Sequence, residues 1–379
     1  MTELAPPAAA LRVPVVDIGA LMACRDDAEV QAILARADGP FRTTISALQS
    51  ALTEWGFFYI ANHGVTPELM ERFQSAIKRF FALPKELKNT IRRDKANPLG
   101  FFDDEFTKNK KDWKEVFDFS GRYEELPENR EANRSAKYQN RWLAESVVPG
   151  FKDTLIEYYD HMEHIARRLL MLVAVSLGEH VTFFDQFFHS KTGFGENGDK
   201  RTRHPDNNSS AMRLNYYPIA RDPEETMGVH HHTDPGALTV LYQDDSVSSL
   251  QVFHRSSQQW QNLPPIADTF VVNIGDMIQV WSNDKYCASL HRALANGTSE
   301  RFSSPFFYNP AFDANIHPVL VDADDQPKYK ELNWHEYIMS KVLGNYVDLG
   351  EEDLHISHYR VEGAAADNIA QPKQHAINA

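Results

Sequence analysis

The sequence predicts a mainly β fold that is flanked by helices on its N-terminal and C-terminal sides. Between residues 212 and 310, short runs rich in apolar and aromatic residues alternate with turn residues, which is typical of a β-sandwich or barrel. Residues 151–177 show the apolar recurrence of a long core helix that braces the sheet. A mixed α/β region therefore precedes a β region.

The N-terminal part has the patterns of alternating strands and helices. The predicted elements are a strand at 13–18 (VPVVDI), a helix at 43–56, a strand entering a turn at 57–64 (FFYIANHG) and a helix at 66–83. Thr66 is the predicted N-cap of the last helix, and a proline follows it at the first helical position. Residues 98–121 are irregular and charged, so we expect no regular element there.

The second half contains β runs separated by turn signals. They lie at 212–218, 237–243, 250–254, 260–264, 269–282 and 301–310. We expect the run at 269–282 (TFVVNIGDMIQVWS) to be one long strand. Residues 331–344 (ELNWHEYIMSKVLG) then predict one more helix.

The composition also predicts how the chain is divided. The expected regions are a disordered start at 1–11, an N-terminal α/β region at 12–190, a flexible insertion at 191–210, a β domain with a C-terminal helix at 211–345, and a tail at 346–379. The insertion is polar and rich in Gly, Asn and Ser, and the tail has no apolar periodicity.

Charge and cysteine content narrow the possible functions. The 379 residues include 39 Lys and Arg against 53 Asp and Glu, and the net charge of -14 repels nucleic acid and anionic lipid surfaces. Two cysteines are too few for a disulfide scaffold. We find neither a signal peptide pattern nor an apolar run of about 18 residues, so we expect a soluble cytoplasmic protein that does not bind nucleic acid or a membrane.

The stretch GVHHHTDPG at 228–236 contains candidate metal ligands. A 2-His-1-carboxylate site needs two imidazoles and one carboxylate on one face of the metal, with the other positions open for substrate and oxygen. Residues two apart on an extended segment point to the same side, so His232 and Asp234 can face one ion. We expect neither His230 nor His231 to be a ligand, and their roles stay open.

Two further features support a metal site. His291 follows the longest predicted strand, and antiparallel strands can bring it back beside Asp234. Arg301 and Ser303 alternate on one strand face, so a guanidinium and a hydroxyl project towards the same pocket. A buried arginine needs an anion, and its planar fork suits a carboxylate such as the distal one of a metal-chelating five-carbon diacid.

These motifs, in their order and spacing, resemble the 2-oxoglutarate and Fe(II)-dependent dioxygenase superfamily, in its isopenicillin-N-synthase-like branch. The likeness covers roughly residues 12 to 310, from VPVVDI and GFFYIANHGV to NYYP, HTDPGALTVL, FVVNIGDMIQVWSN, SLHRA and RFSSPFFYNP. It implies a double-stranded β-helix, a jelly roll of the cupin kind, near residues 212–320. Two departures are His230 and His231 before HTD, where the family usually has a small or apolar residue and a glycine, and NYYPIA in place of the common NYYPPC.

The resemblance also implies the site and the chemistry. It assigns Fe(II) to His232, Asp234 and His291, and 2-oxoglutarate to Arg301, Ser303, Tyr217 and Asn215. The implied reaction uses O2 to oxidise a small-molecule metabolite, by hydroxylation, desaturation or ring formation, and releases succinate and CO2, as in secondary metabolism.

Two residues are candidates for contact with the substrate. Phe307 continues the face of Arg301 and Ser303, with a place in the core as the alternative. Arg213 lies on the face of Asn215 and Tyr217 and can meet an acidic substrate, unless it is a solvated or paired strand cation.

Two other functions remain open at this point. One is an oxidase of the same fold that needs no 2-oxoglutarate, as isopenicillin N synthase does. The other is a non-catalytic binding module, with or without a metal. Release of succinate coupled to turnover would distinguish the 2-oxoglutarate-dependent dioxygenase from the first alternative. Failure to take up Fe(II) would favour the second.

Overall fold

The computed structural model describes residues 12–36, 39–107, 110–121, 139–189, 208–245, 247–320, 325–344 and 355–362. The start predicted to be disordered (1–11) lies outside these residues, as does most of the predicted insertion, 191–207. Of the predicted tail at 346–379, only 355–362 is described, and it contains the short 3-10 helix η4 (Ile356–Tyr359).

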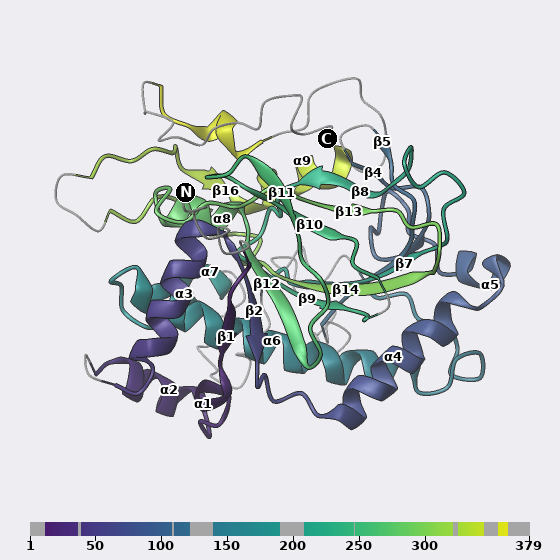
Figure 1. The fold of residues 1–379 in the computed structure, drawn as a ribbon, viewed down its shortest axis with the longest axis horizontal. Coiled ribbons are helices and arrows are strands. Elements are labelled where there is room, and N and C mark those ends of the chain that lie inside the picture. Colours follow the sequence, from purple (N-terminus) through teal and green to yellow (C-terminus); the bar gives the residue numbers. More distant parts are fainter. Residues whose placement is uncertain are drawn as a thin grey trace, which may run out of the picture.

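Two sheets form the centre of the described structure. The larger has eight strands in the order β1 (Val15–Asp17), β2 (Phe57–Ala61), β12 (Thr269–Ile274), β9 (Leu238–Gln243), β14 (Arg301–Tyr308), β7 (Ala211–Tyr217), β6 (Glu115–Ser120) and β3 (Gly100–Phe102). The smaller has the order β11 (Gln259–Asn262), β10 (Leu250–His254), β13 (His291–Leu294) and β8 (Met227–His232). The two sheets lie across from each other in Figure 1.

Two strand pairs and several helices complete the described elements. The pairs are β4 (Phe106–Thr107) with β5 (Lys110–Lys111), and β15 (Asn315–Ile316) with β16 (Leu332–Asn333). The helices are α1 (Gly19–Met22), α2 (Asp27–Leu34), α3 (Arg42–Glu54), α4 (Pro67–Phe81), α5 (Lys85–Asn89), α6 (Phe151–Ser176), α7 (Asp185–Phe188), α8 (Asp276–Trp281) and α9 (Trp334–Gly344). None of the described helices has both the length and the apolar composition that a membrane crossing requires.

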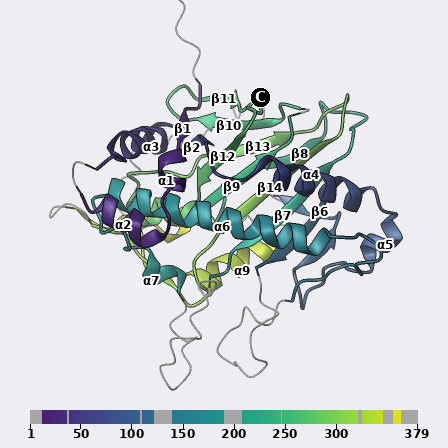
Figure 2. The same ribbon diagram turned by 90° about the horizontal axis from the view of Figure 1, so that it is seen from below.

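The long helix α6 covers the outer face of the larger sheet, as the sequence predicts for 151–177. Figure 2 shows α6 running along that sheet. Tyr159 packs edge-on against Phe306 of β14, with ring centroids 5.0 Å apart, and Tyr158 stacks on Phe73 of α4 at 3.6 Å. α6 is therefore the layer that joins the N-terminal helices to the sheet.

Two of the expected helices begin and end close to their predicted bounds. The helix predicted at 66–83 is α4, and the Thr66 hydroxyl caps it by accepting a hydrogen bond from the Leu69 N–H at 3.3 Å. The helix predicted at 43–56 is α3.

The single long strand expected at 269–282 is wrong. β12 ends at Ile274, and the rest of the run forms helix α8 after Gly275. A Cβ atom on Gly275 would lie 2.3 Å from the Gly236 carbonyl oxygen and 2.7 Å from that of Asp234, so only glycine fits where these backbones meet. The α8 residues are all buried, and a short apolar run that is fully buried reads the same as strand or helix.

Residues 98–121 also differ from expectation, because they contain strands where we expected none. β6 pairs with β7, and β3 pairs with β6, so this segment extends the larger sheet. β8 and β13 were not among the predicted runs either. The three consecutive histidines of β8 (MGVHHH) give no apolar and polar alternation, which hides its strand pattern.

A buried arginine fixes the N-terminal turns to α6. Arg168 is 1% exposed and donates hydrogen bonds to the backbone carbonyls of Leu21 at 2.7 Å and Cys24 at 3.0 Å. Its Nε donates to Asp27 at 3.2 Å. These bonds join the segment between α1 and α2 to α6, and the Leu21 carbonyl also accepts the Cys24 N–H at 3.4 Å.

We expect Arg168→Met to lower the free energy of unfolding by about 3 kcal/mol, because it removes a buried guanidinium that donates to two backbone carbonyls and to the Asp27 carboxylate. The matched control is Arg167→Met. Arg167 also contacts Asp27, at 2.7 Å, but its side chain is 32% exposed, so its loss should cost less than about 1 kcal/mol. Urea unfolding of both variants measures the difference, and equal losses would contradict the anchoring role of Arg168.

Candidate metal and cosubstrate site

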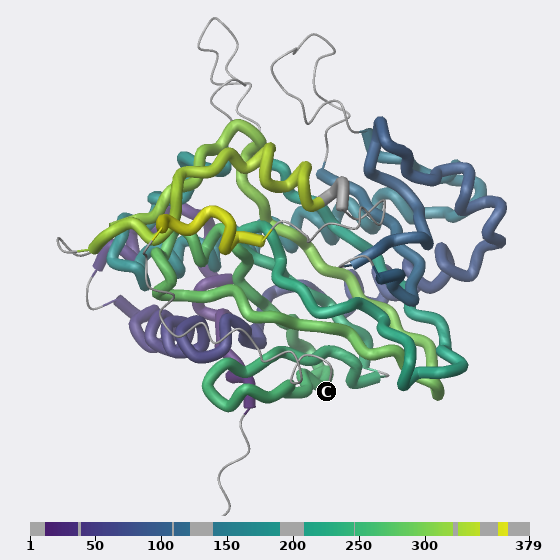
Figure 3. The backbone as a smooth tube through the Cα atoms, turned by 90° about the horizontal axis from the view of Figure 1, so that it is seen from above, coloured from purple at the N-terminus to yellow at the C-terminus, as the bar shows by residue number. Residues whose placement is uncertain are grey.

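A cavity of about 340 Å³ lies between the two sheets. Side chains from β7, β9, β12 and β14 of the larger sheet line it on one side, and residues of β8, β10 and β13 line it on the other. The helix α9 contributes residues as well. Figure 3 shows α9, in yellow-green, lying over one end of the strands.

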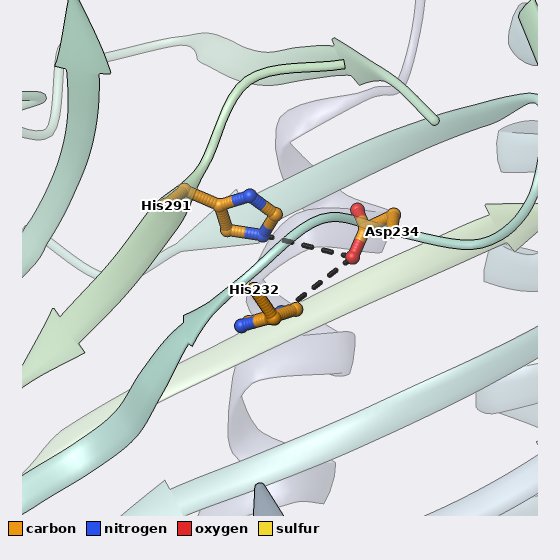
Figure 4. Close-up of side chains that lie close together, drawn as sticks. All are labelled: His232, Asp234 and His291. Carbon is orange, nitrogen blue, oxygen red and sulfur yellow. Dashed lines mark ion pairs between the residues drawn. The ribbon is translucent and has the colours of Figure 1, made fainter. Parts of the chain in front are cut away.

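His232, Asp234 and His291 converge in this cavity. His232 ends β8, His291 begins β13, and the two residues are direct partners in the antiparallel register. Asp234 lies on the loop after β8, and its Oδ1 is 3.6 Å from the Nε2 atom of each histidine. One potential ligand atom from each residue lies within 4.8 Å of the others (Figure 4).

Backbone carbonyls orient both imidazoles. The Nδ1 atom of His232 lies 2.8 Å from the His230 carbonyl oxygen, and that of His291 lies 3.3 Å from the Ser289 carbonyl oxygen. A carbonyl only accepts, so Nδ1 carries the proton in each ring and Nε2 keeps its lone pair. Both lone pairs are thus available for a metal ion.

The Asp234 carboxylate is held by one of its two oxygens. Oδ2 accepts hydrogen bonds from the Thr239 hydroxyl at 2.5 Å and from the Asn273 amide at 2.8 Å. Oδ1 is left facing the histidines. The strands β9 and β12, which carry Thr239 and Asn273, therefore set the direction in which the carboxylate points.

The charge states suit a divalent cation. Burial and the neighbouring His291 lower the pKa of His232 to about 4, so its ring is neutral at neutral pH. Burial opposes ionisation of Asp234, but His291, His232 and the hydrogen bonds from Asn273 and Thr239 outweigh it and lower the pKa of this carboxyl. Two neutral imidazoles and one carboxylate are the donor set of non-haem Fe(II) sites, so the residues fit that ion.

The two extra histidines stand apart from this cluster. His230 turns to Asp112, whose Oδ1 lies 3.0 Å from its Nδ1 and accepts its backbone N–H at 3.2 Å. His231 is half-buried and is not among the cavity-lining residues. Neither side chain belongs to the group around Asp234.

A second group of predicted residues lies on β14 and β7. Arg301 pairs with Tyr217, and Ser303 pairs with Asn215, whose amide lies 3.4 Å from the Ser303 hydroxyl. Arg301 is 3% exposed, and its guanidinium lies 4.9 Å from the centre of the Tyr217 ring and 3.4 Å from the Gln243 amide oxygen.

The Arg301 guanidinium has no carboxylate partner among the described residues. Its Nε and Nη1 are buried and make no hydrogen bond there. A buried cation without a counter-charge is costly, so the arrangement favours an anionic ligand at this point. Arg301 lines the same cavity as His232.

The two substrate candidates also line the cavity, in different surroundings. Phe307 is half-buried on β14. Arg213 is held by Asp118 through two hydrogen bonds of 2.8 Å and by Glu105 at 2.9 Å, so its charge is already balanced. Of the two alternatives left open for Arg213, its surroundings are those of a paired strand cation.

The acidic partners of Arg213 and their neighbour Lys114 were not among the residues predicted from the sequence. Lys114 is buried and lies 2.7 Å from Glu105. Burial opposes ionisation of Glu105, but Arg213 and Lys114 lower its pKa to about 2. A usable signal was Asp118, a charged residue between Phe117 and Phe119 in the strand EVFDFS, which pairs with the strand of Arg213.

Comparisons with known proteins agree with this architecture. Residues 208–310 match the 2OG-Fe(II) oxygenase superfamily, and residues 13–145 match the family described as non-haem dioxygenase in morphine synthesis N-terminal. Among curated relatives, feruloyl CoA ortho-hydroxylase 2 of Arabidopsis thaliana is 31% identical over 78% of this chain and 75% of its own length. Homoarginine-6-hydroxylase 2-ODD-C23 of Glycine max is 31% identical over 89% of this chain and 98% of its own.

A solved structure is similar over most of the chain. The crystal structure of JOX2 in complex with 2OG, Fe and JA superposes with a TM-score of 0.70 at 26% identity, covering 92% of this chain and 89% of that one. The chain belongs to the 2-oxoglutarate and Fe(II)-dependent oxygenase superfamily. The predicted double-stranded β-helix fold, the enzyme class, and the use of Fe(II), 2-oxoglutarate and O2 on a small-molecule substrate are confirmed.

The hydrogen bond from Thr239 to Asp234 leads to a prediction about metal affinity. Thr239→Val keeps the shape but removes this donor, and loss of a group that orients a metal ligand typically weakens binding about 10- to 100-fold. We expect a shift at the lower end of that range in a Co(II) titration, because Asn273 still holds the carboxylate. Thr269→Val is the control, since its hydroxyl bonds the Ile266 carbonyl instead. Unchanged affinity in Thr239→Val would show that this hydroxyl does not orient Asp234.

Proposed function

We propose that His232, Asp234 and His291 hold the catalytic iron and that Arg301 binds the distal carboxylate of 2-oxoglutarate. The observation that carries the proposal is that a pre-oriented pair of histidines, a fixed carboxylate and an unpaired buried guanidinium line one cavity. Ser303, Tyr217 and Asn215 are the proposed additional contacts of the cosubstrate.

The bound iron supplies activation of O2, which is coupled to conversion of 2-oxoglutarate into succinate and CO2 and to oxidation of the substrate. The residues of the chain have separate tasks in this reaction. His232, Asp234 and His291 bind the ion through three positions and leave others for cosubstrate and oxygen. Arg301 fixes one end of 2-oxoglutarate, and the surrounding strands limit access of water to the reacting groups.

We place the substrate beside the metal, against the face of Phe307. The cavity of about 340 Å³ is near the lower end of the usual range for ligand pockets and has to hold 2-oxoglutarate as well. The substrate is therefore a small metabolite. Arg213 shapes this wall together with Asp118 and Glu105.

The remaining expectations concern the setting of the reaction. A role in secondary metabolism agrees with the small-molecule substrates in the names of the relatives. A cytoplasmic location is supported by the free thiols of Cys24 and Cys287. The net charge of -14 argues against nucleic acid as a partner. We retain 12–190 and 211–345 as regions of one folded unit.

The first test of the proposed site replaces each metal ligand. His232→Ala, Asp234→Ala and His291→Ala should each abolish substrate oxidation and weaken Fe(II) uptake while the far-ultraviolet circular dichroism stays unchanged, because the ligands lie on preformed strands. His230→Ala and His231→Ala are the matched controls and should keep iron binding. Loss of iron in His231→Ala together with retention in His232→Ala would overturn the assignment.

The second test separates the cosubstrate from the metal. Arg301→Leu removes the partner of the distal carboxylate, and truncating one side of a buried charge pair costs about 2 to 5 kcal/mol, which is roughly 30- to several-thousand-fold in affinity. We expect the concentration of 2-oxoglutarate at half-maximal succinate release to rise by such a factor at unchanged iron loading. An unchanged curve would remove Arg301 from the cosubstrate site, and turnover without succinate would favour the oxidase that needs no 2-oxoglutarate.

A further inference from the structure

The charged side chains that line the cavity differ in whether their charge is balanced. The cations are Lys114, Arg213, Arg292, Arg301 and Lys341, and the carboxylates are Glu105, Asp118 and Asp234. There are more cations than carboxylates, so the partner of each cation decides which charge is left for a ligand.

Two of these cations are neutralised within the cavity wall. Lys114 lies 2.7 Å from Glu105 and 3.3 Å from Asp112. Arg213 lies 2.9 Å from Glu105 and 2.8 Å from Asp118. Arg93 adds a third cation near Glu105, so three cations stand against three carboxylates and this wall offers no free charge to a ligand.

Arg292 and Arg301 have other partners. Arg292 donates from Nε to the Gln251 side chain at 2.8 Å, and its guanidinium lies 4.2 Å from the centre of the Trp260 ring. Arg301 belongs to the proposed cosubstrate site. There, the charges of Fe(II) and Arg301 cancel those of Asp234 and the 2-oxoglutarate dianion.

Lys341 on α9 is the cavity-lining cation that remains. Its side chain is half-buried, and no carboxylate of the described residues lies within 4.0 Å of its ammonium group, which is 5.8 Å from the centre of the Tyr337 ring. Asp276 interacts with it electrostatically from a greater distance. This carboxylate is buried, accepts a hydrogen bond from the Tyr337 hydroxyl at 2.6 Å through Oδ2, and is not among the residues that line the cavity.

Helix α9 is fixed at the cavity, which gives Lys341 a defined place. The Trp334 indole N–H donates to the Ser209 hydroxyl at 2.7 Å, and Trp334 and Tyr337 are fully buried. Ile338 lies three residues before Lys341, on the same helix face, and also lines the cavity. The ammonium group thus stands next to an apolar surface that borders the metal site.

We infer that the substrate is a small organic acid, with an anionic group that binds the Lys341 ammonium and an apolar body that lies against Ile338 and Phe307. The inference rests on the proposed function, because it takes the charge of Arg301 to be matched by 2-oxoglutarate. A cationic substrate has no free carboxylate to meet, since Glu105 and Asp118 are both in ion pairs. Lys341 is therefore a specificity-determining residue.

The test uses matched acids and amides as probes. Phenylpropanoate, cyclohexylacetate and octanoate, each with its own carboxamide, are added to the full chain loaded with Mn(II) and 2-oxoglutarate. Proton relaxation of the probes by the paramagnetic ion reports binding near the metal, without turnover. In the wild type, we expect the acids to bind more tightly than their amides.

Three variants assign that preference to one side chain. Lys341→Met should lower the affinity for the acids about tenfold and leave the amides unchanged, because it removes a charge-assisted contact. Lys341→Arg should keep the preference. Lys330→Met, at an exposed position, is the control and should behave as the wild type. The inference is wrong if no acid exceeds its amide in the wild type, or if the preference survives in Lys341→Met.

The same samples separate this inference from the proposed function. The protons of 2-oxoglutarate should also be relaxed by Mn(II), in the wild type and in Lys341→Met alike, and this effect should disappear in His232→Ala. If 2-oxoglutarate shows no relaxation, the proposed site itself fails. If 2-oxoglutarate is relaxed and the acids show no preference, only the assignment of Lys341 fails.

Discussion

The close contact between two backbone segments is the constraint on which the site depends. Gly275, at the end of β12, lies against the segment that follows β8, and the Asp276 N–H donates to the Asp234 carbonyl at 2.8 Å. The Gly275 N–H donates to the Ala237 carbonyl at the same distance. The loop that carries Asp234 is therefore held by main-chain atoms, and its side chain needs only two further hydrogen bonds to point towards the histidines.

The shape of the rest of the cavity and its preference for anions depend on how its buried charges are balanced. Where acid and base come from neighbouring strands or loops, as with Asp118 and Arg213, the charges cancel and form a rigid polar wall. Where no carboxylate of the described residues forms an ion pair, as at Arg301 and Lys341, we expect the counter-charge to come from a bound molecule. The wall gives the cavity its shape, and the unpaired cations give it its preference for anions.

Sequence patterns were sufficient for part of this structure. The spacing of His232 and Asp234 and the alternation of Arg301 with Ser303 follow from strand geometry, and the structure brings these residues into one cavity. The helix α8 was not predicted, because all its residues are buried, including the polar Asp276 and Gln279, and so short a run does not distinguish helix from strand. The pairing of Arg213 depends on the register of two strands that are distant in sequence, which no local pattern contains.

Strands from both halves of the chain pair in one sheet, and this affects which parts of the chain can fold without exposed strand edges. β12 lies between β2 and β9, and β7 lies between β6 and β14, so strands from the N-terminal region cover both edges of the later strands. A fragment that began at residue 211 would leave one edge of β7 and one edge of β12 with unpaired backbone groups, and such edges are templates for aggregation. Synthesis from the N-terminus avoids this hazard, because the covering strands leave the ribosome first.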